Sequence, residues 1–558
     1  MTLRAAPLLL LTTFASGCLF APTPYIPPAY VEPELEFVTP SAGDWLGQGQ
    51  VEVQGVARGL ENITLDGQPV TVDADGHFLA AVDVQDGIHL LELRGTEPDG
   101  DVRFARQSVM VGSYAPADEP LHDAARLRLN SSGLDFALQL AEQQVRSADV
   151  QAMALAANPV YQEDMGLFQL RADVQQVSFG ALQLDATPDV GVIHLRAVIP
   201  SVLLSVPVSA RGFFFNADAV ATASANQAIV TGDLTLDAVD GEPVLQLTGV
   251  DIAFQGLQLH TQGLPSPFDQ LLVGDVMDAA LRELLPQAIA SIVPQELALT
   301  LRSMNLSFGL NLLGSQLTAD ASFGSFTIAP DGIEASVDVA VSTPGAGALG
   351  APGFLRASAP PSANHVGDVS LGLSDSLVNL LLFQAWSAGS LDMDLPLNLL
   401  GGEQPIANLI GDGTLHVRPV LPPVVVERQG LQAQIGELGL AVDTPSGNFG
   451  EHIELAASLT SAVGVSDALQ ASGGQGLALA LGSPEMQLAA RASDWGAIDA
   501  ETLTNMLEVV VPVDAVLAAF SGVEVPFPEV RGLAIGGVDV HRSASQSDTD
   551  IVLSLTTP

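Results

Sequence analysis

The feature that most constrains the fold is an order of elements that occurs twice: a helix, a long run of alternating strands, and a second helix. In the helical segments apolar residues recur at a spacing of three or four, and in the strand segments at every second position. The predicted segments are, in order, helix 131–145, strands 168–260, helix 268–293, helix 373–389, strands 391–492 and helix 498–520. The later helix of each set contains a proline, Pro286 or Pro512, that should kink it. The pattern predicts an internal duplication of roughly 200 residues per half.

Three stretches of this region resemble the family of bactericidal/permeability-increasing, lipopolysaccharide-binding and cholesteryl-ester-transfer proteins. "RLRLNSSGLDFALQLAEQQV" is similar to the opening of the family's first domain, and "DVSLGLSDSLVNLLLFQAWSAGSLDMDL" to that of its second. The ending "VEVPFPEVRGLAIGGVDVHRSASQSDTDIVLSL" is similar to the family's terminal strands, so the resemblance extends from Leu121 to the C-terminus. It implies an α+β tubular lipid-binding fold, in which two twisted antiparallel sheets each wrap around a long helix and a central sheet joins them.

The implied domains follow the repeat. We expect an N-terminal tubular domain at 118–305, a central sheet and linker at 306–364, and a C-terminal tubular domain at 365–558 whose final strands return to the central sheet. The segment "PGAGALGAPG" at 344–353 is typical of a linker, because its two prolines and its glycines oppose regular structure.

A lipid-binding groove is the function that the resemblance implies, and the residue types of the helices favour it. The helices carry alanine, valine and leucine, and small side chains on both walls of a groove leave room for acyl chains. Burying an acyl chain is favourable by about 0.8 kcal/mol per methylene, so sixteen carbons would contribute on the order of 10 kcal/mol before ordering costs. The residues predicted to line the grooves are Leu138, Val145, Leu272, Val276 and Ala280 in the first domain and Leu381, Ala385, Met506 and Val510 in the second. The alternative is a structural or adhesive surface protein whose grooves are filled by its own side chains.

The charge of the chain narrows the choice of partner. The formal net charge is −45, and all nineteen basic residues are arginine. Such a surface repels DNA, RNA and anionic head groups within a Debye length of about 8 Å, so a nucleic-acid partner is excluded. The endotoxin-binding members of the family have a cationic tip, which this chain lacks, and its single cysteine cannot form the disulfide of the mammalian members. We therefore expect a phospholipid or a similar neutral amphiphile as the ligand, while the oligomeric state stays open.

The N-terminal segment predicts secretion and a lipid anchor. An apolar run from Ala5 to Phe14 follows Arg4, which is typical of a signal peptide, here 1–17. The residues before Cys18, Ala15-Ser16-Gly17, resemble a bacterial lipobox, which implies acylation of Cys18 (palmitate among its chains) and, with Leu19 next to it, an outer-membrane lipoprotein facing the periplasm or the cell exterior. The proline-rich segment 18–36 is expected to be a stalk. The alternative is an ordinary secreted protein with a free cysteine.

Between the stalk and the repeat, residues 37–113 resemble an immunoglobulin-like β-sandwich. Short alternating segments are separated by the turn pairs Asp66-Gly67 and Asp75-Gly76. Asp73 and Asp75 could ligate calcium, but a tight turn explains them without a metal. We expect this module to act as a spacer or to dock onto the rest of the chain.

The sequence gives little support for catalysis. It contains neither a Gly-x-Ser-x-Gly elbow nor a His-Glu-x-x-His motif, and its nine histidines are scattered. We expect no enzyme activity, no cofactor and no metal site, and an esterase or phospholipase remains the third alternative.

Overall fold

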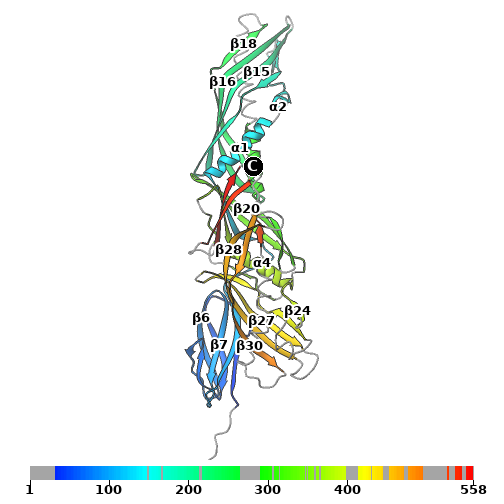
Figure 1. The fold of residues 1–558 in the computed structure, drawn as a ribbon. Coiled ribbons are helices and arrows are strands. Elements are labelled where there is room, and N and C mark those ends of the chain that lie inside the picture. The colour runs from blue at the N-terminus through cyan, green and yellow to red at the C-terminus, as the bar shows by residue number, and fades with distance from the viewer. Residues whose placement is uncertain are drawn as a thin grey trace, which may run out of the picture.

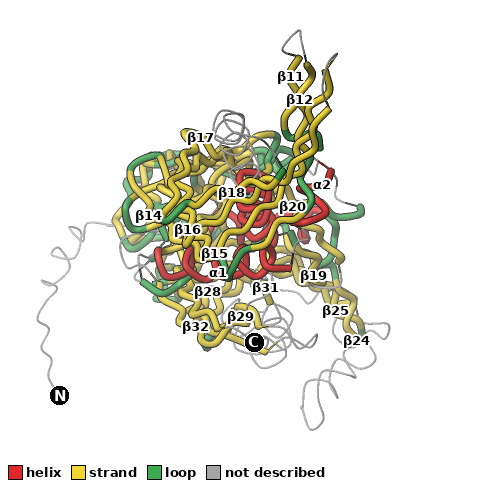
Figure 2. The backbone as a smooth tube through the Cα atoms, turned by 90° about the horizontal axis from the view of Figure 1, so that it is seen from above, coloured by secondary structure: helices red, strands yellow, loops and turns green. Residues whose placement is uncertain are grey.

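The computed structural model shows an elongated molecule built mainly of antiparallel strands (Figure 1). The chain's described residues are 32–147, 150–156, 158–164, 168–212, 216–263, 289–304, 307–312, 315–345, 347, 350–356, 360–363, 366–396, 413–428, 430–443, 452–469, 475–493, 524–526, 534–542 and 548–556. Viewed along its length, helical segments lie within the outline that the strands form (Figure 2).

The N-terminal unit is a two-sheet β-sandwich, as the resemblance to immunoglobulin-like modules implies. Its first sheet consists of β1 (Glu34–Thr39), β3 (Gly49–Arg58) and β6 (His77–Val84). Its second sheet consists of β2 (Trp45–Leu46), β8 (Val102–Val111), β7 (Gly87–Thr96), β4 (Glu61–Leu65) and β5 (Gln68–Pro69). Asp66 and Gly67 both have positive φ and close the hairpin between β4 and β5, which confirms that turn. The first strand begins at Glu34, inside the segment predicted to be the stalk.

A seven-stranded sheet occupies the middle of the molecule. In spatial order it contains β19 (Phe308–Leu312), β20 (Ser315–Ala329), β21 (Gly332–Ser342), β10 (Leu121–Asn130), β23 (Val369–Ser374), β33 (Asp548–Thr556) and β32 (Ala534–Arg542). Strands from both halves of the repeat therefore meet in one sheet. The last two strands of the chain, β32 and β33, lie at one edge of it.

The N-terminal half of the repeat forms a curved eight-stranded sheet above the central one in Figure 1. Its main path is β11 (Tyr161–Asp164), β12 (Phe168–Ala172), β15 (Val192–Gly212), β16 (Asn216–Val239) and β17 (Glu242–Gln255), and β13 (Gln176–Ser178), β14 (Gln183–Asp189) and β18 (Gln258–Gln262) pair with β15 or β16. β15 has 21 residues and β16 has 24, so each extends for about 70 Å or more.

The two long strands keep a single face buried along their length. On β15 the buried side chains lie at odd positions up to Ile199 and at even positions from Val202 onward. On β16 the same change occurs at the same level, between Ala225 and Ala228. Ser201, at the centre of the change, has a φ of 54°. Because both strands change phase together, their pairing continues and the inner face stays apolar.

Helices lie against this sheet. They are α1 (Ser131–Ser147), α2 (Val150–Ala156) and a helical segment at 289–303. The described part of the last of these starts at 289, within the predicted helix 268–293, and runs ten residues beyond the predicted end, through Pro294. Leu134, Leu138, Val293 and Leu297 are buried in the same core as the inner face of the sheet. The rest of the predicted helix, including Pro286, lies outside the described residues.

The C-terminal half forms the second eight-stranded sheet. It contains β24 (Met393–Pro396), β25 (Thr414–Pro419), β27 (Leu431–Asp443), β28 (His452–Leu469), β29 (Gln475–Leu481) and β31 (Glu524–Pro526), with β26 (Val424–Glu427) paired to β27 and β30 (Glu485–Ser493) paired to β28. Its helix α4 (Asp375–Ser387) lies where the sequence predicts, and the Ser374 side chain caps it by accepting a hydrogen bond from the Ser376 N–H. The predicted helix 498–520, with Pro512, lies outside the described residues.

The sandwich docks onto the C-terminal half. The short strands β9 (Tyr114–Ala115) and β22 (Phe354–Leu355) pair across the junction. The rings of Trp45 in the sandwich and Trp386 in α4 lie 6.4 Å apart. Of the two roles predicted for this module, docking is the one that these contacts support.

Candidate functional site

The inner face of the N-terminal sheet carries a row of alanines that the strand periodicity places side by side. Four inward positions of β16, which we call the alanine strip, hold the smallest side chain that a strand can bury; they are Ala219, Ala221, Ala223 and Ala225. The outward positions between them hold polar residues or Val220. Since alanine lacks the branches of valine and leucine, the side chains of the strip project less from the sheet than those of its neighbours.

Larger apolar side chains border the strip on the β15 side. The cross-strand partners of the four alanines are Val208, Val206, Leu204 and Val202, and all four are buried. Directly paired residues in an antiparallel sheet lie on the same face. The strip therefore runs beside a continuous apolar ridge on the neighbouring strand.

Leucines border the strip on the β18 side. Leu259 pairs with Ala223 and so lies on the inner face, yet it is 39% exposed. Leu257, two residues earlier, is 37% exposed. An alkyl chain placed along the strip would have apolar side chains on both sides, which is the chemistry that an acyl chain requires.

The structure places the predicted groove residues of the first domain unevenly. Leu138 lies on α1, is 2% exposed and belongs to the same core as the alanine strip. Val145 lies in the last turns of α1, and its side chain is not among those described. Leu272, Val276 and Ala280 lie outside the described residues, so their role stays a prediction.

In the second domain, Leu381 and Ala385 lie on α4 and are 1% and 0% exposed. Nearly every residue of α4 is buried, so the helix is surrounded by protein on all sides. The Asn379 side chain fixes this packing: its amide donates to the carbonyls of Leu355 and Val425 at 3.2 and 3.1 Å, and its oxygen accepts from the Val425 N–H at 2.7 Å. Around α4 the described side chains pack as a closed core. Met506, Val510 and Cys18 lie outside the described residues.

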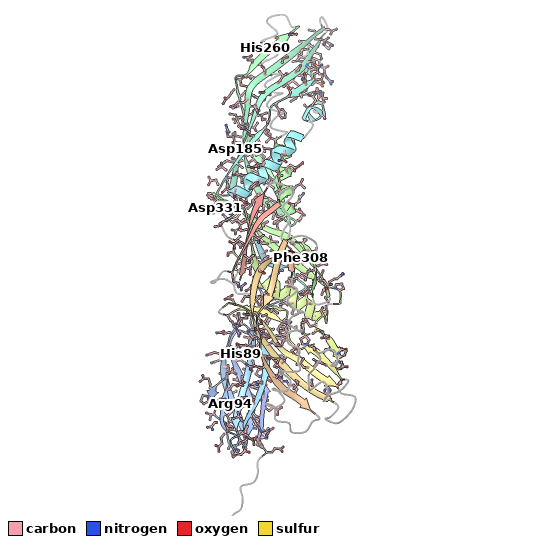
Figure 3. The ribbon with its side chains drawn as sticks, in the orientation of Figure 1. His89, Arg94, Asp185, His260, Phe308 and Asp331 are labelled. Atoms are coloured by element: carbon pink, nitrogen blue, oxygen red, sulfur yellow. The ribbon has the colours of Figure 1, made fainter. Side chains whose placement is uncertain are left out.

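Acidic groups gather where α1 meets β14. Burial and the nearby carboxylate of Asp185 raise the pKa of Asp135 on α1. Glu142, two turns further along the helix, accepts a hydrogen bond from the Leu184 N–H at 2.7 Å. Figure 3 shows Asp185 on this part of the molecule. An anionic head group would be repelled here, whereas a neutral or zwitterionic one would not.

The described part of the chain offers no metal centre: in it, no three histidine, cysteine, aspartate or glutamate side chains are grouped so as to hold an ion. The Asp73 carboxylate accepts hydrogen bonds from the backbone N–H groups of Asp75 and His77, at 2.9 and 2.8 Å. These bonds, that from His77 first, lower the pKa of Asp73. The turn interpretation of Asp73 is therefore supported.

The alanine strip was missed at the sequence level, although its signal is visible. The segment "ADAVATASA" has alanine at every second position from Ala217 to Ala225. The helical spacing of apolar residues indicates only the walls formed by helices and carries no information on the wall formed by the sheet. Alternation of one small residue type over nine positions would have found it.

Among the residues that the structure describes, no helix combines the length and the apolar character needed to cross a lipid bilayer.

Comparisons with known proteins found no matching family model and no matching curated protein sequence. Among solved structures, the chain is similar to a lipopolysaccharide binding protein, with 12% identity, a TM-score of 0.39 and coverage of 78% of this chain and 99% of that one. It is also similar to P47 of Clostridium botulinum E1, with 8% identity, a TM-score of 0.32 and coverage of 78% and 100%. P47 from Clostridium botulinum A2 gives 8% identity, a TM-score of 0.31 and coverage of 78% and 98%.

Proposed function

We propose that this protein binds phospholipid-like amphiphiles, with an acyl chain lying along the alanine strip, and that it sequesters or transfers them while attached to the outer membrane through Cys18. The observation that carries the proposal is the strip itself: four buried alanines in register with a ridge of valine and leucine on one side and a half-exposed Leu259 on the other. Alanine at four successive inward positions takes up the least side-chain volume on this face, which is what an acyl chain bound along the strip would require.

The energetics favour a ligand without charge specificity. Each buried methylene contributes about 0.8 kcal/mol, so an acyl chain supplies most of the binding free energy by itself. The acidic groups beside α1 and the formal net charge of −45 disfavour anionic head groups. A zwitterionic phospholipid meets both conditions.

The second candidate is a structural or adhesive surface protein, and the packing around α4 favours it for the C-terminal half. Leu381 and Ala385 are enclosed there by protein side chains, with Asn379 bonded on both sides of its amide. We therefore place the ligand in the N-terminal half and assign the α4 region a structural role. Hydrolysis of the lipid is not part of the proposal.

Native mass spectrometry of the Cys18→Ser protein tests this function, because that variant carries no covalent lipid. We expect a complex with one phospholipid per chain, whose identity lipid extraction then gives. A bare chain that also takes up no fluorescent phospholipid from vesicles would refute the proposal and favour the structural role.

A further inference from the structure

We propose that the docked sandwich is a fixed base that points the N-terminal half of the repeat away from the membrane carrying the chain, so that lipid is exchanged with a second, facing lipid surface. The inference rests on the proposed lipid binding and membrane attachment. It concerns which lipid surface exchanges lipid with the protein, a question that the proposed function does not answer.

The contact between the sandwich and the C-terminal half has an apolar centre of its own. Side chains from both units form a separate buried cluster, which we call the base cluster; it consists of Ile88, Met110, Leu355, Leu421, Val424 and Val426, with Trp45 and Tyr114 packed against it. The Tyr114 hydroxyl donates to the carbonyls of Leu46 and Met110, and burial raises the pKa of that hydroxyl. An apolar contact of this kind resists hinge motion, unlike the polar and loosely packed contacts typical of mobile domains.

Polar contacts around the base cluster fix the position of the sandwich on the C-terminal half. Glu437 is 4% exposed, and its carboxylate accepts two hydrogen bonds from Arg491, both at 2.7 Å. The same carboxylate accepts the Ser108 N–H of the sandwich. Arg491 also donates to the Arg106 carbonyl at 2.8 Å. Pulling the two units apart would break the hydrogen bonds that cross the contact, from the Ser108 N–H to Glu437 and from Arg491 to the Arg106 carbonyl, which costs free energy.

The backbone at the contact is shaped for close approach. Glu437 has a φ of 47° and lies in a β-bulge of β27, which turns its side chain toward the sandwich. A Cβ on the preceding Gly436 would lie 2.5 Å from the Ile88 Cγ2 and 3.0 Å from the Ser108 Cβ. Glycine is therefore required at 436 by the sandwich and not by the sheet to which it belongs.

The chain enters the base at the end remote from the alanine strip. β1 begins at Glu34, which forms an ion pair with Arg58. The chain then runs toward Gly43, which lies so close to Val420 of the C-terminal half that a Cβ at position 43 would be 2.7 Å from the Val420 Cγ1. Figure 3 places Arg94 of the sandwich near one end of the molecule and His260 of β18 near the other. His260 pairs with Thr222, and the 18 residues of β16 from Thr222 to Val239 alone cover about 55 Å.

Electrostatics favours an upright molecule over one that lies on its own membrane. The chain has a formal net charge of −45, and lying flat would bring more of it within a Debye length of about 8 Å of anionic head groups than standing on one end would. Standing upright leaves only the base close to them. The end that faces away carries half-exposed apolar side chains, Leu257 and Leu259, beside the strip.

A two-vesicle assay tests the direction of exchange. The full chain, acylated at Cys18, is bound to carrier vesicles of phosphatidylcholine with a minor fraction of phosphatidylglycerol. A self-quenched fluorescent phosphatidylcholine is placed either in the carrier vesicles or in a second vesicle population. We expect extraction from the second population, at a rate that rises with its concentration and exceeds extraction from the carrier vesicles at least tenfold.

Variants of the base test its part in this preference. Gly436→Val should displace the sandwich from the C-terminal half and reduce the preference for the second vesicle population to less than threefold. Gly464→Val is the control and should leave this preference unchanged, because the nearest atom to a Cβ at position 464 is 3.6 Å away. Arg491→Ala is a second variant that removes the partner of Glu437 and the bond to the Arg106 carbonyl without changing a side chain of the base cluster, and circular dichroism confirms the fold of each. A preference that survives both base variants would overturn the proposal.

The outcomes separate this proposal from the function on which it rests. Equal extraction from both vesicle populations by the parent chain would refute the fixed direction while leaving lipid binding in place. Absence of extraction from either population, together with absence of uptake by the Cys18→Ser protein in solution, would refute the proposed function and trans exchange with it.

Discussion

Replacing Ala223 with leucine separates a strip that receives a ligand from a strip that is merely a well-packed core. Ala223 is 1% exposed and lies between Leu204 and Leu259 in register. The substitution adds three carbon atoms at the centre of the strip. If an acyl chain occupies this surface, about three of its methylenes lose their place, which weakens binding by about 2.4 kcal/mol, or roughly 50-fold.

The two alternatives predict opposite effects on the ligand-free protein. Where protein side chains already fill the space, three extra carbons overpack the core and reduce the free energy of unfolding by about 1–3 kcal/mol. Where the space belongs to a ligand, the ligand-free protein changes little. Displacement of a fluorescent phospholipid measures the affinity, and denaturation of delipidated protein measures stability.

Ser224→Leu is the matched control, because residue 224 is the next position of β16 and lies on the outer face. It should leave both affinity and stability close to those of the parent. If Ala223→Leu binds lipid as tightly as the parent but unfolds more easily, the strip is core and the assignment of the ligand to it is refuted.

Three further predictions concern stability and titration. Asn379→Ala should lower the free energy of unfolding by about 3 kcal/mol, because the Val425 N–H and the carbonyls of Leu355 and Val425 lose buried partners; a loss below about 0.5 kcal/mol in chemical denaturation would contradict the role given to this amide. Gly372→Ala should destabilise the central sheet by about 2 kcal/mol or more, since a Cβ there would lie 1.8 Å from the Ser362 carbonyl oxygen, and a thermal midpoint equal to that of the parent would show that the two segments are not in contact. A hydrogen bond to Asp338, at 2.7 Å, raises the pKa of His122 above 6.5. Protonated His122 should therefore stabilise the fold below about pH 6.5, and this contribution should be lost as the pH rises through the raised pKa; NMR titration should show the shift in the parent and its disappearance in Asp338→Asn, and an identical pKa in both would contradict the pairing.

The regular elements were predictable because their periodicity is local. The strands of the sandwich, the turn at Asp66-Gly67 and the helix α4 with its Ser374 cap follow from alternation, turn chemistry and capping within a few residues. The return of the last strands to the central sheet was predictable only through the resemblance, because pairing between β23 and β33 joins residues that are far apart in the sequence.

Features that depend on contacts between distant residues could not be predicted. Nothing in the sequence around Gly436 indicates that glycine is needed there. The need comes from Ile88 of the sandwich, which lies against this position in the folded protein. Leu381 and Ala385 have the spacing of a groove wall, but residues of β22 and β26 pack over α4, and the described side chains there leave no groove beside them. The helical spacing of apolar residues cannot predict which strands will cover a helix. The helical segment that reaches 303 through Pro294 shows the same effect, since burial of Val293 and Leu297 outweighs the hydrogen bond that proline removes.

Photocrosslinking is the most direct test of the central claim that an acyl chain lies on the alanine strip. The Cys18→Ser protein is loaded with a phosphatidylcholine that carries a photoactivatable group midway along one acyl chain, irradiated, digested and sequenced by mass spectrometry. We predict that the adducts concentrate on the β15 and β16 peptides that contain Leu204 and residues 219–225, and that Ala223→Leu removes most of them. Adducts confined to the peptides of α4 and the C-terminal sheet, or spread evenly over the surface, would contradict the account.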